Sequence, residues 1–310
     1  MSVIESPNKQ VFQVQEVYSG PHGQLLEGTT YDERTDTFFY IDVKAGTVYA
    51  VANSTGSTKA AEDKIKAYKV SNTIGFVGLT TDVNKIICAV DLGITLLDLT
   101  TGETEQIAAY PNGNIVNGGQ LRSNDGGIDK DGTLWIGTME GGLHRRFGSM
   151  YLLKQKGGVL TELWNECFIP NGINWDEKNG VMYWTESGEH TIYKYDYDAS
   201  NNHVYLDSKT KYFVDEKDPD GSCLDKDGNL YVAIYGSNKV IRITRKGEID
   251  MEWKFPSQNI TCCIFGDKDL SSLYVSCGNG AAEGDLGAAI FKIDLSQLGI
   301  KGVPSHKFIL

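Results

Sequence analysis

PDGSCLDKDGNLYVAIYGSNKVIRI, at residues 219–243, is the stretch from which the fold of this chain can be predicted. It opens on the turn-forming dipeptide Asp220-Gly221 and continues through an apolar strand into a second polar turn at residues 225–228. An alternating strand from Leu230 follows, and a turn at residues 236–238 leads into another strand. The pattern predicts short strands joined by tight turns, and similar segments recur along the whole sequence.

Six segments repeat this pattern, and each can be aligned on the first apolar residue after a polar turn. The first four intervals between these anchors are all 48 residues, and the last is 43 residues. A period of 40–50 residues built from short strands is typical of a β-propeller, in which each repeat forms a four-stranded blade. The sequence therefore predicts an all-β, six-bladed propeller with a central channel, formed as a single domain by residues 1–310. The six anchors are Phe38, Ile86, Leu134, Met182, Leu230 and Leu273.

Two terminal segments lie outside the six repeats, at residues 11–17 and 302–310. We expect one or both to supply an outer strand that closes the ring, because closure removes the exposed edge of the last blade. A polar insert at residues 54–64 and a glycine-rich stretch at residues 278–287 are predicted to be surface loops.

The composition restricts the class of partner. The formal net charge is −12, and no run of basic residues is longer than the pair Arg145-Arg146, which disfavours nucleic acid and anionic membranes. A small molecule is the expected partner, and no pattern signals a dimer, so a monomer is favoured.

The chain shows no signal-like N-terminus and no apolar run of about 18 residues, which predicts a cytoplasmic protein. The six cysteines include no C-x-x-C pair and are predicted to be reduced and mostly buried.

Polar residues recur at one position of the repeat. Glu27 and Asn171 each stand eleven residues before their anchors, and Asn124 and Asp220 each stand ten residues before theirs. Because the innermost strand of every blade lines the channel, we expect these four side chains to converge. Carboxylate and amide oxygens suit a hard divalent cation, with Ca²⁺ first and Mg²⁺ or Mn²⁺ next.

The other two blades hold Gly75-Phe76 and Cys262-Cys263 at this position. An alternative interpretation is that Asn171-Gly172 and Asp220-Gly221 are simply turn dipeptides. The agreement of four blades favours a shared site. The five histidines do not occupy these positions, and no nucleophilic triad is visible.

The motif-bearing segments resemble one known family. The resemblance is to the gluconolactonase, regucalcin (senescence marker protein) and luciferin-regenerating enzyme family, and it covers essentially the whole chain. It implies a six-bladed propeller with one divalent metal in the channel, and commonly the hydrolysis of sugar lactones. Ca²⁺ is expected first, with Mg²⁺, Mn²⁺, Zn²⁺ and Fe²⁺ as alternatives. The segments are LLEGTTYDERTDTFFYIDV, LRSNDGGIDKDGTLWIGTM, IPNGINWDEKNGVMYWTES and PDGSCLDKDGNLYVAIYGSNKV.

The resemblance implies metal-ligand roles for three residues. Glu27 matches the glutamate of the family's Glu-Gly-Pro motif, although Thr29 replaces the proline. Asn171 matches the asparagine of its Asn-Gly motif. Asp220 matches the aspartate of Pro-Asp-Gly, which is both a metal ligand and the proposed general base.

The resemblance also implies substrate contacts. Arg122 and Asn124 match the arginine and asparagine of the Arg-Phe-Asn-Asp-Gly motif, with Ser123 in place of the aromatic residue. The family often carries a substrate-binding acid a few residues after the position of Met139. Glu140 is the candidate for that role in this chain.

The predicted function is hydrolysis of a sugar lactone. A bound cation can polarise the lactone carbonyl while Asp220 takes a proton from the attacking water. Two alternatives stay open. The same site could hydrolyse phosphotriesters, or the protein could be a non-catalytic calcium-binding or interaction propeller, because fold alone does not settle function.

Overall fold

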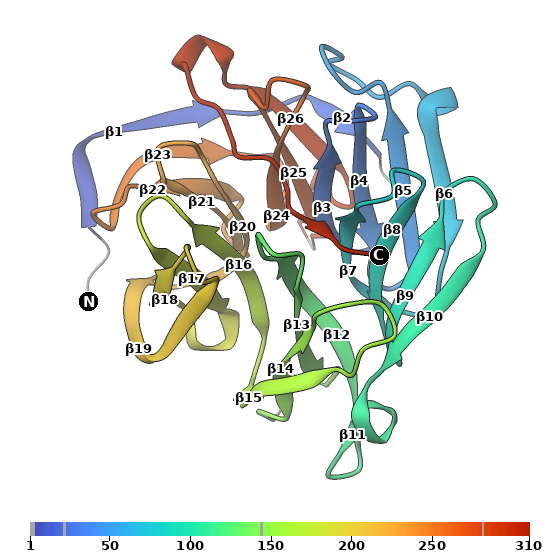
Figure 1. The fold of residues 1–310 in the computed structure, drawn as a ribbon. Coiled ribbons are helices and arrows are strands. Elements are labelled where there is room, and N and C mark those ends of the chain that lie inside the picture. Colours follow the sequence, from blue (N-terminus) through green and yellow to red (C-terminus); the bar gives the residue numbers. More distant parts are fainter. Residues whose placement is uncertain (1–3, 21–22, 143–144, 281) are drawn as a thin grey trace.

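The protein is an all-β structure of six sheets arranged around a central axis (Figure 1). The computed structural model describes residues 4–20, 23–142, 145–280 and 282–310. Each sheet contains four antiparallel strands of a blade, which are consecutive in the first five blades, and three sheets carry a fifth strand. The predicted six-bladed propeller is confirmed.

The innermost strands form the wall of the channel. Each packs against the innermost strand of the next blade, and the last packs against the first, so the six form a closed ring. In chain order they are β3 (Leu26–Asp32), β7 (Ile74–Thr80), β12 (Gly119–Ile128), β16 (Pro170–Asp176), β20 (Asp218–Leu224) and β24 (Asn259–Gly266).

The repeat anchors all lie at the first or second position of the second strand of a blade, where each is at most 2% exposed. The apolar residue after each turn is therefore the point at which the blade enters the core. The second strands are β4 (Thr37–Asp42), β8 (Lys85–Val90), β13 (Leu134–Glu140), β17 (Val181–Glu186), β21 (Leu230–Tyr235) and β25 (Ser272–Gly278).

Two further strands complete each blade toward the periphery. The third strands are β5 (Thr47–Ala52), β9 (Gly93–Asp98), β14 (Gly148–Leu153), β18 (Thr191–Asp198), β22 (Lys239–Ile243) and β26 (Ile290–Asp294). The outer strands of the first five blades are β6 (Ile65–Lys69), β10 (Thr104–Ala109), β15 (Thr161–Cys167), β19 (His203–Val214) and β23 (Glu248–Lys254). Short additional elements are β11 (Ile115–Val116) and the 3₁₀ turns η1 (Glu62–Lys64), η2 (Pro111–Asn114), η3 (Ser187–Glu189) and η4 (Ser296–Leu298).

The stretch at residues 219–243 forms β20, β21 and β22, as predicted. The turn between β20 and β21 depends on Asp225, whose Oδ1 accepts the backbone N–H groups of Asp227 and Asn229, each at 2.9 Å. The dipeptide Asp220-Gly221, however, is not a turn. It lies inside β20, at a point where the pairing with β21 shifts register.

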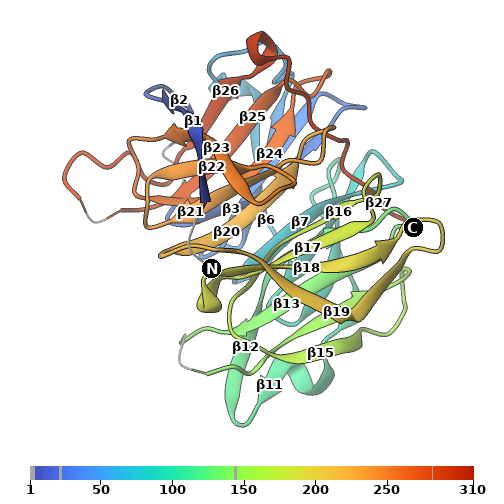
Figure 2. The ribbon, with the colours of Figure 1, turned by 90° about the vertical axis from the view of Figure 1, so that its left-hand side faces the viewer.

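The N-terminal segment closes the ring, as predicted. β2 (Val17–Ser19) pairs antiparallel with β26 and becomes the outer strand of the sixth blade. β1 (Ile4–Gln13) pairs parallel with β23 as a fifth strand on the fifth blade (Figure 2). The single strand expected at residues 11–17 is therefore divided between two blades.

The C-terminal tail does not supply an outer strand, although the sequence allowed either terminal segment to do so. β27 (Lys307–Phe308) pairs parallel with the last residues of β7, which is an inner strand. Before it, Gly302 bridges to Asp225, so the tail crosses the end of the channel from the fifth blade to the second (Figure 1). Its His306 lies 2.8 Å from a carboxylate oxygen of Glu177.

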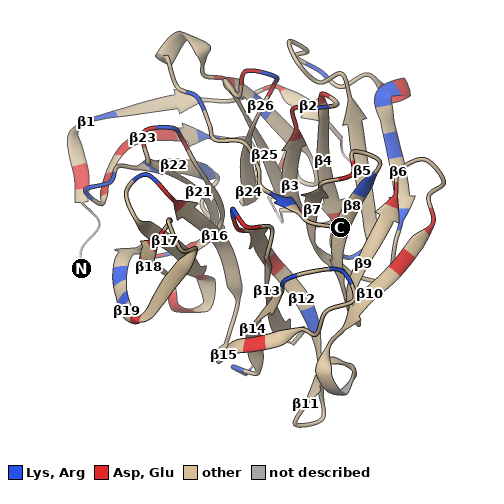
Figure 3. Cartoon of the chain, in the orientation of Figure 1, with Lys and Arg blue, Asp and Glu red and all other residues tan. Residues whose placement is uncertain are grey.

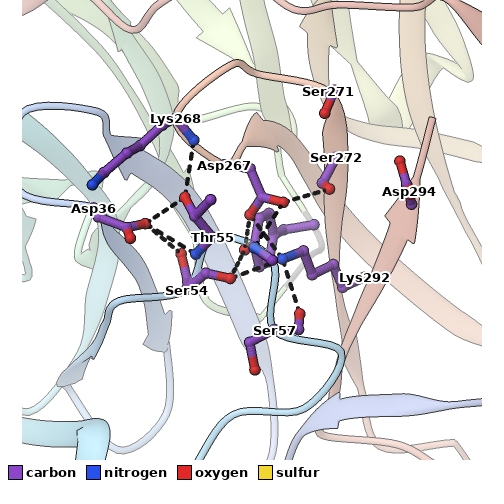
Figure 4. Close-up of polar contacts among 12 residues, drawn as sticks. Asp36, Ser54, Thr55, Ser57, Asp267, Lys268, Ser271, Ser272, Lys292 and Asp294 are labelled. Carbon is purple, nitrogen blue, oxygen red and sulfur yellow. Dashed lines mark hydrogen bonds and ion pairs between the residues drawn. The ribbon is translucent and has the colours of Figure 1, made fainter. Parts of the chain in front are cut away.

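A lysine whose side chain is 8% exposed, Lys292, ties the first and sixth blades together (Figure 4). The Nζ of Lys292 lies 2.7 Å from Oδ1 of Asp267 and donates to the carbonyl oxygens of Ser54 and Ser57 at 2.8 and 2.9 Å. Ser54 is fully buried and Ala60 is 7% exposed. The insert at residues 54–64 is thus mostly a surface loop, as expected, but it is pinned to the sixth blade.

Other sequence expectations can be compared with the structure. All six cysteines are free and buried, as predicted. The glycine-rich stretch is largely an exposed loop, apart from Ala281, which lies outside the described residues. Acidic and basic residues are interspersed on the strands and loops of the blades (Figure 3). No helix within the described ranges combines the length and the apolarity that crossing a membrane requires.

Replacing Lys292 with methionine should lower the free energy of unfolding by about 3–5 kcal/mol, because it leaves the Asp267 carboxylate buried without its cation. Equilibrium unfolding in urea measures the change. Lys301→Met is the matched control, since the ion pair of Lys301 with Asp269 is exposed and should contribute at most about 1 kcal/mol. Equal losses in the two variants would show that Lys292 does not lock the ring.

Candidate metal centre

One position of each inner strand has the same register in all six blades. In every blade the anchor pairs with a residue near the end of the inner strand. Counting four residues back from that partner gives the same position in each blade, which we call the channel layer. This register corrects the sequence alignment in the sixth blade, where Thr261 rather than Cys262 takes the position. The channel layer consists of Glu27, Gly75, Asn124, Asn171, Asp220 and Thr261.

A β-bulge interrupts each inner strand at this layer. In all six blades the pairing between the first and second strands shifts register at or beside the channel-layer residue. A bulge re-aims the side chain that it carries, and bulges are common beside active sites. Each inner strand is thus bent at the channel layer, where four of the six blades carry the candidate polar side chains.

The glycines beside these residues allow the inner strands to approach one another. A Cβ atom on Gly172 would lie 2.3 Å from Oγ of Ser222, and one on Gly221 would lie 2.5 Å from Sγ of Cys262. Neither distance is compatible with a side chain, so both positions need glycine. The interpretation of Asn171-Gly172 and Asp220-Gly221 as turn dipeptides is therefore wrong, because both lie within strands.

A chain of hydrogen bonds crosses the channel layer from the third blade to the fifth. Arg122 donates to Oδ1 of Asn124 at 2.8 Å, and Nδ2 of Asn124 donates to Oδ1 of Asn171 at 2.9 Å. Nδ2 of Asn171 then donates to the hydroxyl of Ser187 at 2.7 Å, and that hydroxyl donates to the carbonyl oxygen of Pro219 at 2.5 Å. The structure therefore brings Arg122, Asn124 and Asn171 together with the residue that precedes Asp220.

Three carboxyl groups share this environment. Burial, followed by the nearby charge of Asp125, raises the pKa of Glu27 to about 8. Burial raises the pKa of Asp125 to about 7. The pKa of Asp220 is raised well above its usual range, first by burial and then by the charges of Glu27 and Asp125. Burial is the main cause of all three shifts, because it disfavours the charged form of a carboxyl group.

Asp125 was not among the candidate site residues selected from the sequence. It follows Asn124 directly and lies within the bulge, where the pairing shifts between Ser123 and Gly126. The signal was present in the sequence, since Asn124-Asp125-Gly126 contains an acid before glycine as Asp220-Gly221 does. Counting from the anchor selected Asn124 alone. Only the bulge in the structure shows that Asn124 and Asp125 both lie in this part of the channel.

The positive charge in this region comes from Arg122. Burial lowers the pKa of its guanidinium group, while the charges of Glu27 and Asp220 act to raise it. Its hydrogen bonds to described residues use one terminal nitrogen, which donates to Asn124 and to the carbonyl oxygen of Ser123. The rest of the guanidinium group is available to a bound molecule.

The chemistry of the donors fits a hard cation. Oδ1 of Asp220 is buried and has no hydrogen-bond partner among the described residues. An unpaired buried carboxylate oxygen is costly, and a cation would satisfy it. Within the described ranges no three His, Cys, Asp or Glu side chains converge closely enough to hold a metal alone. A cation bound here would therefore need at least one ligand of another kind, such as the amide oxygen of Asn171.

Glu140 lies apart from this group. Its carboxylate is 6% exposed and forms an ion pair with Arg145, in the loop that follows β13. Glu140 stands opposite Leu121, whereas Arg122 stands opposite Met139, so alternation along the strands places Glu140 on the other face of the blade. Its role in substrate binding stays a prediction.

The two departures from the family motifs have local partners. The hydroxyl of Thr29 donates to Sγ of Cys262 at 3.2 Å, which links the first blade to the sixth. The hydroxyl of Ser123 donates to the carbonyl oxygen of Val90 at 2.7 Å and lies 2.8 Å from the hydroxyl of Tyr110. Both polar replacements are thus satisfied by neighbouring blades.

A cavity of about 140 Å³ lies in the channel between this layer and the C-terminal tail. Asp125 and Gly28 line it at the layer, and residues 303–306 line it at the far end. The tail therefore covers the end of the channel at which the inner strands finish.

The comparisons with known proteins identify the family. Residues 25–279 match the model of the SMP-30/Gluconolactonase/LRE-like region. The chain belongs to this family. It is 29% identical to the cell growth-regulated gene 1 protein of Candida albicans, over 90% of this chain and 92% of that protein. It is 32% identical to regucalcin of Bos taurus, over 60% of this chain and 66% of that protein.

Solved structures agree with the fold. The crystal structure of a calcium-binding protein, regucalcin, from Agrobacterium tumefaciens superposes with a TM-score of 0.84 at 22% identity. The match covers 97% of this chain and 99% of the regucalcin chain. It confirms the six-bladed propeller.

In the presence of a chelator, the free energy of unfolding should fall as the pH rises from about 5 to about 8. A carboxyl group with a raised pKa binds its proton more tightly in the folded protein. Its contribution to stability is therefore present below the usual carboxyl pKa and is lost as the pH passes the values of about 7 for Asp125 and about 8 for Glu27. Urea unfolding at several pH values measures this dependence.

Asp125→Asn is the control for this dependence, because it removes one of the three carboxyl groups without changing the size of the side chain. The variant should lose less stability than the wild type over the same pH range. A pH-independent stability of the chelated wild-type protein would contradict the assignment of a strained carboxylate layer.

Proposed function

We propose that the protein is a metal-dependent hydrolase that opens a sugar lactone in the channel. The observation that carries the proposal is the buried Oδ1 of Asp220, which has no hydrogen-bond partner among the described residues and lies near Glu27, Asp125 and the guanidinium group of Arg122. The family to which the chain belongs includes gluconolactonases, which supports lactone hydrolysis as the reaction.

Glu27, Asn171 and Asp220 would hold one divalent cation. The donors are all oxygen atoms, and two of them are carboxylates, which suits Ca²⁺ first and Mg²⁺ or Mn²⁺ next. The structural relative from Agrobacterium tumefaciens is described as calcium-binding, which supports the same choice. When bound, the cation would act as a Lewis acid on the lactone carbonyl.

Asp220 is the proposed general base. Its Oδ1 is buried and accepts no hydrogen bond from the described residues, so the carboxylate can accept a proton from a water molecule beside it. The carboxylate takes a proton from water as the water oxygen bonds to the carbonyl carbon. The ring C–O bond then breaks, and the proton passes to the departing ring oxygen, which leaves an open-chain hydroxy acid.

Arg122 and Asn124 would contact the substrate, as the resemblance implies. The guanidinium group is buried beside the carboxylates and retains N–H groups that can donate to hydroxyl or carbonyl oxygens. Asn124 is held at both ends of its amide, by Arg122 and by Asn171. Its greater contribution is therefore to fix the guanidinium group and the amide of Asn171 relative to one another.

Replacing Asp220 with asparagine should lower kcat/KM for lactone hydrolysis by about 10²–10⁴-fold, because the proton acceptor is lost. Steady-state kinetics with gluconolactone measure the change. Asp227→Asn is the matched control, since Asp227 is an exposed acid in the turn after the same strand. Equal activity of the two variants would exclude Asp220 as the base.

Chelation should abolish lactone hydrolysis, and re-addition of Ca²⁺, Mg²⁺ or Mn²⁺ should restore it. A panel of gluconolactone and of pentono- and hexono-1,4-lactones, with a phosphotriester beside them, measures the substrate class. Activity that survives complete chelation would contradict the mechanism. Turnover of the phosphotriester alone would favour that alternative, and metal binding without any turnover would favour a binding module.

A further inference from the structure

Ser187 connects the two neighbouring blades that supply Asn171 and Asp220. It is the first residue of η3 and is 3% exposed. Its hydroxyl contacts the amide nitrogen of Asn171 in the fourth blade and the carbonyl oxygen of Pro219 in the fifth, at 2.7 and 2.5 Å. Pro219 directly precedes Asp220, so one hydroxyl touches the side chain of one proposed ligand and the backbone next to another.

The hydrogen-bond roles at this hydroxyl are fixed. A carbonyl oxygen can only accept, so the single proton of Ser187 must be donated to Pro219. The hydroxyl oxygen can then only accept from Asn171, which requires the NH₂ group of that amide to face Ser187. The amide oxygen of Asn171 must therefore point the other way, into the channel layer, where Asn124 donates to it at 2.9 Å.

The backbone around Ser187 is also held in place. Its N–H donates to the carbonyl oxygen of Ile169 at 3.0 Å. The buried carboxylate of the preceding Glu186 accepts the N–H groups of Phe168 and Ile169, at 3.0 and 2.6 Å. The segment leading into Asn171 is thus tied to η3, and Ser187 sits on a rigid support.

We propose that Ser187 is a positioning residue of the metal centre, which turns the amide oxygen of Asn171 toward the cation and fixes its distance from Asp220. This inference rests on the proposed function. Groups that orient the ligands of a metal commonly alter its affinity by about 10–100-fold when they are removed. In this protein Ser187 would orient ligands that come from two neighbouring blades.

The neighbouring Thr185 provides a matched control. Its hydroxyl is fully buried on the same strand end, directly opposite Asn171, and has no hydrogen-bond partner among the described residues. Thr185→Val removes a buried hydroxyl of similar size and position without removing a hydrogen bond. Its effect on the metal centre should therefore be negligible.

Calorimetric titration of the full chain with Ca²⁺ alone tests the proposal. Ser187→Ala should weaken Ca²⁺ binding by about 10–100-fold. Ser187→Thr, which keeps the hydroxyl, should retain most of the affinity, and Thr185→Val should bind as the wild type does. Ser187→Cys keeps a side chain of similar volume, but its thiol forms only weak hydrogen bonds, so this variant should also bind Ca²⁺ less tightly. It replaces the alanine variant in the test if that variant does not fold.

The outcomes separate this inference from the proposed function. Wild-type affinity in Ser187→Ala and Ser187→Cys would overturn the positioning role and leave the metal centre standing. An equal loss in Thr185→Val would also overturn it, since packing rather than the hydrogen bond would then decide affinity. A wild-type protein that binds no Ca²⁺, Mg²⁺ or Mn²⁺ would overturn the proposed metal centre, and the role of Ser187 with it.

Discussion

The structure depends on the close approach of six inner strands around one axis. Side chains cannot fit where these strands meet, as the distances at Gly172 and Gly221 show. The glycines remove that obstacle, and the β-bulges turn the residues beside them into the channel. The same constraint that closes the ring therefore also gathers polar side chains from separate blades at one level.

Gathering acids in this way has an electrostatic cost. Glu27, Asp125 and Asp220 are buried near one another, and each has a raised pKa. Arg122 offsets part of the negative charge, but an oxygen of Asp220 stays without a partner among the described residues. Functional sites commonly concentrate such unfavourable groups, and the strain is tolerated because the rest of the fold is stable. In this protein the closed ring supplies that stability.

Closure of the ring is reinforced at several points outside the channel. β2 completes the sixth blade, and Lys292 joins that blade to the insert of the first through a buried ion pair with Asp267. The C-terminal tail crosses the far end of the channel and ends against β7. These contacts link segments that are distant in sequence.

The sequence alone determined the repeat, and with it the positions from which the candidate site residues were chosen. Apolar residues such as Leu230 recur after turns because each blade must enter the core at the same point. Counting from those anchors selected Glu27, Asn171 and Asp220 as candidate ligands, since equivalent positions of a closed ring face one axis. The sequence also predicted that one or both terminal segments would complete a blade, and the N-terminal segment does so.

Tertiary structure decided what counting could not. A bulge adds a residue to one strand, so only the paired strands show that Asp125 joins the carboxylates and that Thr261 takes the place assigned to Cys262. The path of the tail and the contacts of Lys292 and Ser187 depend on which surfaces meet across blades. Local sequence cannot encode such contacts, because their partners lie in other repeats and are brought together by the closure of the ring.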